Sequence, residues 1–217
     1  MAICGDANGV PRRVPYADHP AGFCEVHGDG SRRALVLHGG FWRDRYDLSL
    51  MDGLCEDLAG RGWEAWNAEY RRLGGGDAWP EMAADVRAAA QLAQAEVAIG
   101  HSAGGHLALW VAAEGLVARA VGQAPVSDLV AGAPLSGGVV AELGAPVPEA
   151  SPRQRLPLGV RQLLVHGTLD DCVPVAMSRD YAAAAPDEVT YVEREGEGHF
   201  EHLDPRSGAW QDVIAWL

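Results

Sequence analysis

The sequence has few cysteines, and they do not form a metal-binding pattern. Its 217 residues include four cysteines, at positions 4, 24, 55 and 172, with no C-x-x-C pair and no histidine at ligand spacing. This distribution argues against a structural zinc centre, and a chain of this length can bury enough apolar surface to fold without disulfides. We therefore expect reduced thiols and no metal site.

Basic residues and long apolar runs are also scarce. Lysine and arginine number 17 against 30 acidic residues, which gives a formal net charge of −13. Such acidity disfavours binding to nucleic acids and to anionic membrane surfaces. No apolar run reaches the length of a transmembrane helix, and residues 1–20 lack the apolar core of a signal peptide. We expect a cytoplasmic protein with neither nucleic-acid nor membrane partners.

What the sequence does contain is a regular alternation of strand-like and helix-like segments. Residues 1–30 are rich in Gly, Pro, Asp and His and predict an irregular N-terminal arm, with a short edge strand near 22–26. Beyond it, we expect strands at 32–40, 63–71, 97–102, 118–125, 160–167 and 188–195 and helices at 47–62, 81–96, 103–115, 174–185 and 204–217. A loop is expected at 74–80, and short helices over a pocket at 126–158. The strands are apolar without alternation, which predicts one α/β domain over 1–217 with a mostly parallel sheet covered on both faces.

The segment "VAIGHSAGGHLALW" places a serine where a strand pattern changes to a helix pattern. Gly100, Ser102 and Gly104 fit G-x-S-x-G, in which a nucleophilic serine lies on a strained strand-to-helix turn between small residues. The backbone N–H of Ala103 would then face a developing oxyanion. Because this five-residue pattern arises easily by chance in a Gly- and Ala-rich chain, a simple helix N-cap is the alternative, and the strand–turn–helix context favours the nucleophile.

A nucleophilic serine needs a base and a carboxylate, which in this architecture follow it in the order acid, then histidine. Asp170 and Asp171 both lie in the turn after the strand at 160–167. Asp204 is a third acid, better placed to cap the last helix. His199 follows Gly and precedes Phe in a loop after the next strand, whereas His202 lies among acidic residues. The pattern favours Asp170 and His199 and leaves the neighbouring residues as rivals.

Four further histidines have structural interpretations. His101 flanks the serine and, by the geometry of the turn, points away from its hydroxyl. His106 lies on the following helix, and His38 and His166 end strands. Residues at such positions usually bond to the backbone, so we do not expect them to act as bases.

A glycine-rich loop follows the first clear strand. The segment "LHGGFW" spans residues 37–42, where a second oxyanion donor is expected. Consecutive glycines let the backbone approach a ligand closely. The N–H groups of Gly40 and Phe41, together with that of Ala103, therefore form a candidate oxyanion hole.

These motifs together resemble the α/β-hydrolase family over residue 33 to the C-terminus. "HGGFW" at 38–42 is similar to the HGG-x-W element of kynurenine formamidases and related small esterases, and "GHSAGGHLA" at 100–108 to their nucleophile turn. "HGTLDDCVP" at 166–174 resembles H-G-x-x-D-x-x-V-P, a register that selects Asp170. "GEGHF" at 196–200 resembles the segment that carries the histidine and selects His199, and "PYADHP" at 15–20 resembles the N-terminal approach in that group.

The resemblance implies an α/β-hydrolase fold with a minimal lid and a cofactor-free, metal-independent serine hydrolase. The expected catalytic residues are Ser102, Asp170 and His199, the oxyanion hole is Gly40, Phe41 and Ala103, and the substrate pocket includes Gly39, Trp42 and His101. The substrate is a small ester or amide, either an N-formyl arylamide such as N-formylkynurenine or a simple carboxylic ester. The HGG-x-W element also occurs in carboxylesterases and prolyl-oligopeptidase-like peptidases. A non-catalytic binding protein on this scaffold is the hypothesis from a different functional class. A homodimer through the final helix or an edge strand is compatible with the sequence, but no residue requires one.

Overall fold

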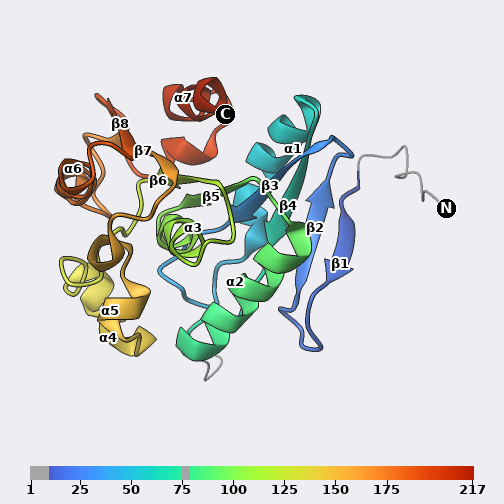
Figure 1. Cartoon of the computed structure of the whole chain (residues 1–217), viewed down its shortest axis with the longest axis horizontal. Coiled ribbons are helices and arrows are strands. Elements are labelled where there is room, and N and C mark those ends of the chain that lie inside the picture. Colours follow the sequence, from blue (N-terminus) through green and yellow to red (C-terminus); the bar gives the residue numbers. More distant parts are fainter. Residues whose placement is uncertain (1–9, 75–78) are drawn as a thin grey trace.

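A computed structural model describes residues 10–74 and 79–217 (Figure 1). Eight strands form one sheet in the order β1-β2-β4-β3-β5-β6-β7-β8. Strands β3 to β8 run parallel to one another, and β1 and β2 are antiparallel to their neighbours. In chain order, the bounds of β1 to β8 are Arg12–Pro15, Phe23–His27, Arg32–Leu37, Trp63–Ala68, Val97–His101, Arg119–Gln123, Arg161–Gly167 and Val189–Arg194. The predicted, mostly parallel sheet is confirmed.

The N-terminal segment differs from the expected irregular arm. β1 and β2 form an antiparallel hairpin, and β2 pairs with β4 through Cys24 opposite Ala68. Cys24 and Val26 are buried against the rest of the sheet. The strand expected near 22–26 is confirmed as β2, but it is not at the edge of the sheet, because it pairs with β1 on one side and β4 on the other. The prediction of irregular structure was wrong for residues 12–15, which form the edge strand β1. Residues 1–9 lie outside the described part of the chain.

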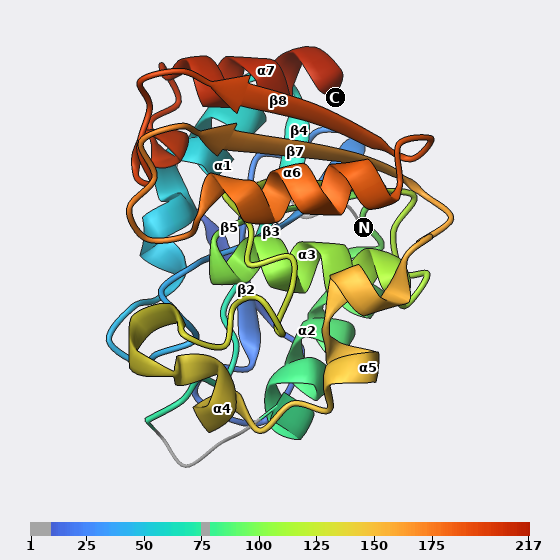
Figure 2. The same ribbon diagram turned by 90° about the vertical axis from the view of Figure 1, so that its left-hand side faces the viewer.

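Helices cover both faces of the sheet (Figures 1 and 2). On one face, α1 (Asp52–Gly60) and α7 (Gly208–Trp216) pack on one apolar cluster. On the other, α2 (Trp79–Ala93), α3 (Ala103–Ala113) and α6 (Val175–Ala184) enclose a second, larger cluster. Successive residues of a strand enter opposite clusters, as Leu35 and Val36 of β3 do. Burial on both sides explains why the strands read as unbroken apolar runs.

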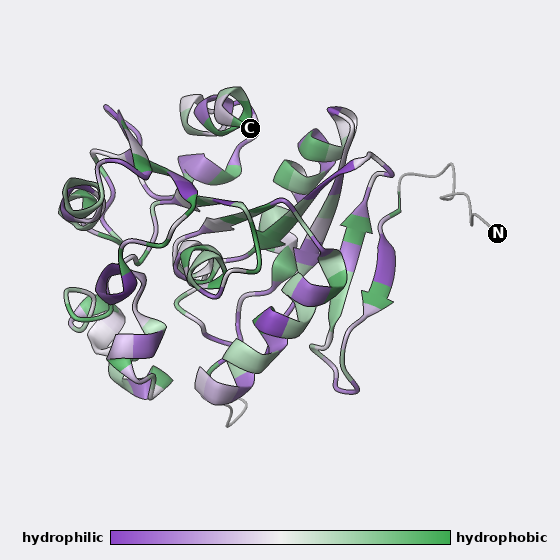
Figure 3. Ribbon diagram, viewed as in Figure 1, coloured by the Kyte–Doolittle hydropathy of each residue, from purple (hydrophilic) through white to green (hydrophobic). Residues whose placement is uncertain are grey.

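The central helix α3 is the most deeply placed of these helices. Its residues from 103 to 112 are all buried, whereas α2 presents hydrophilic residues on its outer side (Figure 3). The helix enters directly from β5, so the turn that joins them is held by packing on every side. A serine in that turn is positioned by the core and not by a mobile loop.

The segment 126–158 holds short helices, as expected. These are η2 (Leu135–Gly137), α4 (Val139–Leu143), α5 (Val147–Ala150) and η3 (Pro152–Arg155). α4 is tied to the loop after β3 by paired hydrogen bonds from Arg43 to Glu142, at 3.1 and 3.0 Å. This compact segment matches the expected minimal lid.

The remaining expected elements coincide with the observed ones to within a few residues. The helix expected at 47–62 begins as a short turn, η1 (Leu48–Met51), before α1. The expected loop at 74–80 falls partly on residues 75–78, outside the described residues, and Trp79 and Pro80 already belong to α2. Within the described residues, no helix combines the length and hydrophobicity needed to cross a bilayer.

Candidate active site

The three expected catalytic residues follow the carboxyl ends of three parallel strands. Ser102 comes directly after β5, Asp170 three residues after β7, and His199 in the loop after β8. Because the carboxyl ends of parallel strands meet at one edge of a sheet, this edge is the usual place for a site in such folds.

The turn at Ser102 is strained and tightly packed. Ser102 has φ 56° and ψ −117°, outside the regions that non-glycine residues prefer. A Cβ atom at Gly100 would lie 2.0 Å from the carbonyl oxygen of Gly104, and one at Gly104 would lie 2.0 Å from that of Leu37. Only glycine fits at either position, which is the requirement that the G-x-S-x-G pattern expresses.

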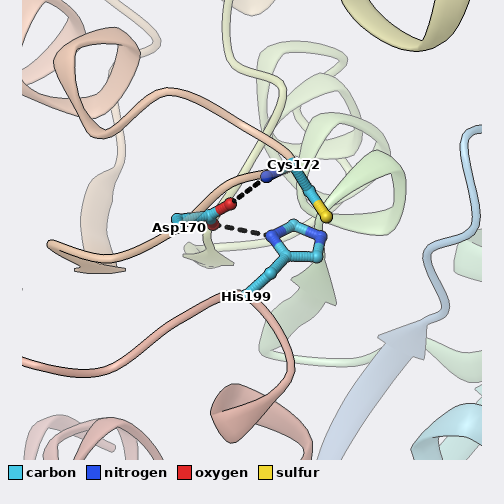
Figure 4. Close-up of side chains that lie close together, drawn as sticks. All are labelled: Asp170, Cys172 and His199. Atoms are coloured by element: carbon cyan, nitrogen blue, oxygen red, sulfur yellow. Dashed lines mark hydrogen bonds and ion pairs between the residues drawn. The ribbon is translucent and has the colours of Figure 1, made fainter.

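Asp170 and His199 are joined by a short hydrogen bond. The Nδ1–H of His199 donates to Asp170 Oδ2 at 2.6 Å, and both side chains are almost fully buried (Figure 4). Asp170 Oδ1 accepts the backbone N–H groups of Cys172 and Val173 at 2.9 and 2.8 Å. The backbone of the turn therefore fixes the carboxylate through Oδ1, and Oδ2 remains directed toward the imidazole of His199.

The rival residues make different contacts. The Asp171 side chain accepts a hydrogen bond from the Cys172 thiol at 3.4 Å. Asp204 forms an ion pair with Arg206 at 3.0 Å. His202 is buried, and burial lowers its pKa to about 3. The geometry thus brings together the pair that the sequence favoured.

A second imidazole also faces Asp170. His166 Nε2 lies 3.1 Å from Asp170 Oδ2 and 3.0 Å from the carbonyl oxygen of Val173, while its Nδ1 accepts the Ser178 hydroxyl at 2.8 Å. Burial alone would raise the pKa of Asp170, but hydrogen bonds from His166 and His199 hold that pKa well below its usual value. Asp170 is therefore an ionised acceptor at neutral pH. The sequence pattern identified His166 as structural but did not reveal this contact.

Ser102 and His199 are connected through His101. The Nε2–H of His101 donates to the carbonyl oxygen of His199 at 2.9 Å, and the two rings are 4.6 Å apart between centroids. Among the described residues, no hydrogen bond joins the Ser102 hydroxyl to His199. Catalytic hydrogen bonds are often long in the absence of substrate and tighten in the reactive complex.

The glycine loop packs directly against the serine. A Cβ atom at Gly39 would lie 3.0 Å from Ser102 Cβ. Gly40, Phe41 and Trp42 all have positive φ, at 108°, 52° and 56°. Within the described residues, the backbone N–H groups of Gly40, Phe41 and Ala103 make no hydrogen bond to the protein. They are therefore free to donate to a ligand.

A buried carboxylate behind this loop was not found from the sequence. Glu69, just after β4, accepts the His38 Nε2–H at 3.1 Å and the backbone N–H of Leu48 at 3.2 Å. Tyr70 donates its hydroxyl to the carbonyl oxygen of His38 at 2.7 Å. Burial would raise the pKa of Glu69, but the hydrogen bond and charge of His38 lower it overall. The feature of the sequence that could have identified Glu69 is its position as an acidic residue directly after a buried strand.

The residues expected to line the pocket have different positions. Gly39 lies against Ser102, whereas Trp42 is completely buried with its ring 5.3 Å from that of His106. His101 is also buried, and burial lowers its pKa well below the usual value. Trp42 and His101 therefore support the loops of the site from within the core.

The chain matches solved esterase structures over nearly its whole length. Esterase 2 of the planctomycete Thermogutta terrifontis with bound propionate matches with a TM-score of 0.80 and 23% identity, over 96% of this chain and 92% of that one. The same esterase phosphonylated by sarin matches with a TM-score of 0.81 and 21% identity, over 97% and 93%. A truncated carbohydrate esterase from gut microbiota matches with a TM-score of 0.76 and 16% identity, over 98% of each chain.

The chain has the fold of these esterases. The expected fold class is thereby confirmed, and the order and direction of the strands agree with it. No protein-family model and no curated protein sequence matches the chain. At these identities the similarity concerns the fold.

We predict that Gly100→Ala destabilises the protein strongly. The added methyl group would meet the carbonyl oxygen of Gly104, so the loss in free energy of unfolding should be about 3 kcal/mol or more. Gly60→Ala, at a helical position with no neighbour within 4 Å, is the matched control and should change stability by less than about 1 kcal/mol. Urea unfolding measures both, and equal stability of the two variants would contradict the tight turn.

We also predict that Asp170 stabilises the fold in a pH-dependent way. Because its pKa is lowered on folding, its contribution is present above the unfolded pKa of about 3.9 and is lost as the pH falls toward the folded value. Asp170→Asn should cost roughly 2–3 kcal/mol at neutral pH and less in acid. Urea unfolding at pH 7 and pH 3, with the exposed neighbour Asp171→Asn as control, checks this. If the loss in free energy of unfolding for Asp170→Asn were as large at pH 3 as at pH 7, the predicted pH dependence would be wrong.

Proposed function

We propose that the protein is a serine hydrolase that cleaves small esters through a covalent acyl-enzyme. The observation that carries this proposal is the 2.6 Å hydrogen bond between Asp170 and His199, at the same sheet edge as the strained Ser102. A buried carboxylate on Nδ1 fixes the imidazole tautomer and leaves Nε2 as the base. This is what a serine hydroxyl requires to become a nucleophile.

The proposed reaction has two steps. Ser102 Oγ attacks the carbonyl carbon while His199 Nε2 takes the hydroxyl proton, and the same proton then goes to the departing alcohol. Water next attacks the acyl-enzyme with His199 again as the base, which releases the acid and restores Ser102. The free N–H groups of Gly40, Phe41 and Ala103 would hold the negative oxygen in both steps.

Two features support a small acyl group. Segment 126–158 is compact and contains only short helices. Among the structurally similar proteins, Thermogutta terrifontis esterase 2 has been solved with propionate and with butyrate bound. We infer that short acyl chains are accepted here too.

Two exposed apolar side chains beside the triad, Leu169 and Phe200, form an apolar rim and indicate which leaving groups the site binds. Leu169 and Phe200 are 66% and 64% exposed, and each is adjacent in sequence to a triad residue. The Phe200 ring also meets that of His199 edge to face, with 5.3 Å between centroids. Exposed large apolar side chains of this kind favour an apolar alcohol, since burying them against the substrate is favourable.

The formamidase hypothesis concerns the same site with a different bond. The sequence resemblance to kynurenine formamidases would make the substrate an N-formyl arylamide, whose aromatic leaving group would also suit the apolar rim. A peptidase resembling prolyl oligopeptidase and a non-catalytic binding protein are two further hypotheses. A formamidase and a peptidase would each prefer a different substrate, and a binding protein would hydrolyse none. Comparing the hydrolysis of several substrates therefore distinguishes these hypotheses.

We predict that the protein hydrolyses p-nitrophenyl acetate and butyrate and that the triad is essential. Ser102→Ala, His199→Gln and Asp170→Asn should each lower kcat by roughly 10³-fold or more, since the triad residues act as a unit. A fluorophosphonate probe should label the parent protein and not Ser102→Ala.

A substrate panel of esters, N-formylkynurenine and peptide amides, with Ser102→Ala as background, decides between the candidate reactions. Preferential turnover of N-formylkynurenine would support the formamidase hypothesis, and preferential turnover of peptide amides would support a peptidase. No labelling and no turnover would identify a binding protein and end the hydrolase proposal.

We further predict that Phe200→Ser reduces selectivity for apolar leaving groups. Its kcat/KM for 2-naphthyl butyrate should fall roughly fivefold relative to methyl butyrate, because losing partial burial of one apolar side chain costs about 1 kcal/mol. Leu92→Ser is the matched control. Leu92 is 38% exposed near the end of α2, toward the amino ends of the parallel strands, and its variant should keep the parental ratio. An unchanged ratio in Phe200→Ser would argue against the rim.

A further inference from the structure

A thiol lies beside the imidazole of the proposed base. One ligand atom from each of Asp170, Cys172 and His199 lies within 4.8 Å of the others. Figure 4 shows the Cys172 sulfur next to the ring nitrogen of His199 that faces away from Asp170. The proposed reaction uses this nitrogen but assigns no role to the thiol.

The other two donor atoms of this cluster, an imidazole nitrogen of His199 and the sulfur of Cys172, are of the kinds that zinc prefers. The Cys172 thiol donates a hydrogen bond to Asp171 Oδ1 at 3.4 Å, and this hydrogen would be lost when the sulfur binds a metal. Zn²⁺ and its thiophilic relatives bind imidazole nitrogen and cysteine sulfur. A metal-binding histidine usually donates its other ring N–H to a carboxylate, which fixes the ring and raises the basicity of the ligand nitrogen. Asp170 already holds His199 in this way, at 2.6 Å.

Asp170 is an outer partner here, and not a ligand. Its Oδ1 accepts the N–H groups of Cys172 and Val173, and its Oδ2 faces His166 and His199. The cation would therefore bind on the opposite side of the imidazole, between Nε2 and the sulfur. Water would fill the remaining coordination positions.

Access and charge also favour a cation. Cys172 is half-buried, whereas Cys24 and Cys55 are completely buried. The formal net charge of −13 attracts cations to the protein. Spacing along the chain did not indicate this site, because its cysteine and histidine are 27 residues apart and meet only through the loops after β7 and β8.

We propose that a thiophilic divalent cation of the Zn²⁺ class binds between His199 Nε2 and Cys172 Sγ and inhibits the enzyme reversibly. On binding, the thiol proton passes to solvent and the sulfur–metal bond replaces it. The cation occupies the lone pair that would accept the Ser102 proton, so the base is blocked. The inhibitory consequence rests on the proposed hydrolase function, whereas the binding does not.

Cadmium absorption tests the binding without any activity. Titration of the full-length Cys4→Ser protein, which removes the one thiol outside the described residues, should give a saturable cadmium–thiolate charge-transfer band at one equivalent. The band should persist when Ser102→Ala is added and disappear when Cys172→Ser is added. His199→Gln should weaken binding by about tenfold or more. A band that survives Cys172→Ser, or unweakened binding in His199→Gln, would overturn the site.

Cadmium NMR of the protein with both ligands intact guards against a variant that fails to fold. A chemical shift typical of mixed sulfur and nitrogen ligation supports the site. A shift that excludes nitrogen ligation overturns it.

Zinc inhibition tests the consequence. Zn²⁺ should inhibit ester hydrolysis by the Cys4→Ser protein, and adding Cys172→Ser should raise the half-inhibiting concentration about tenfold or more, each rate being normalised to that variant's metal-free rate. Equal inhibition of both proteins would overturn the inhibitory role. If neither protein hydrolyses any ester, the proposed function fails, and the cadmium experiment still decides the binding site.

Discussion

The close contact between the end of β3 and the start of α3 is the constraint on which the site depends. The carbonyl oxygen of Leu37 lies where a side chain of Gly104 would be, and Gly39 lies against Ser102. This contact brings the glycine loop and the serine turn together, so the candidate oxyanion donors and the candidate nucleophile lie side by side. Both segments are strained, with positive φ at Phe41, Trp42 and Ser102. Strain of this kind persists only where the surrounding core determines the backbone, and buried α3 does so here.

Two buried carboxylates stabilise the two sides of the site. Asp170 holds His199 after β7, and Glu69 holds His38 behind the glycine loop after β4. Each is desolvated, and each is compensated by backbone N–H groups together with an imidazole. Hydrogen bonds to such charges orient loops that would otherwise adopt many conformations. In the proposed reaction the hydrogen bond from His199 to Asp170 keeps the imidazole in one tautomer, and in the proposed metal site it would orient the same ring.

Much of the fold and of the candidate site could be predicted from the sequence. The apolar runs at 32–37, 97–101 and 161–167 became central parallel strands because both their faces are buried. The positions of Gly100 and Gly104 around Ser102 could be recognised because steric exclusion permits only glycine there. The strand near 22–26 was expected, but β1 and the interior position of β2 were not, since the pairing of β2 with β4 joins segments that are distant in the sequence.

The sequence by itself determined the alternation of strands and helices, the strained serine turn and the order serine, aspartate, histidine. These follow from local sterics and from the period of apolar residues, which act over a few neighbouring positions. The tertiary structure decided which groups meet: His166 with Asp170, Glu69 with His38, and Cys172 with His199. Such contacts join residues on separate loops, and their distances are set by strand order and register, which no local pattern encodes.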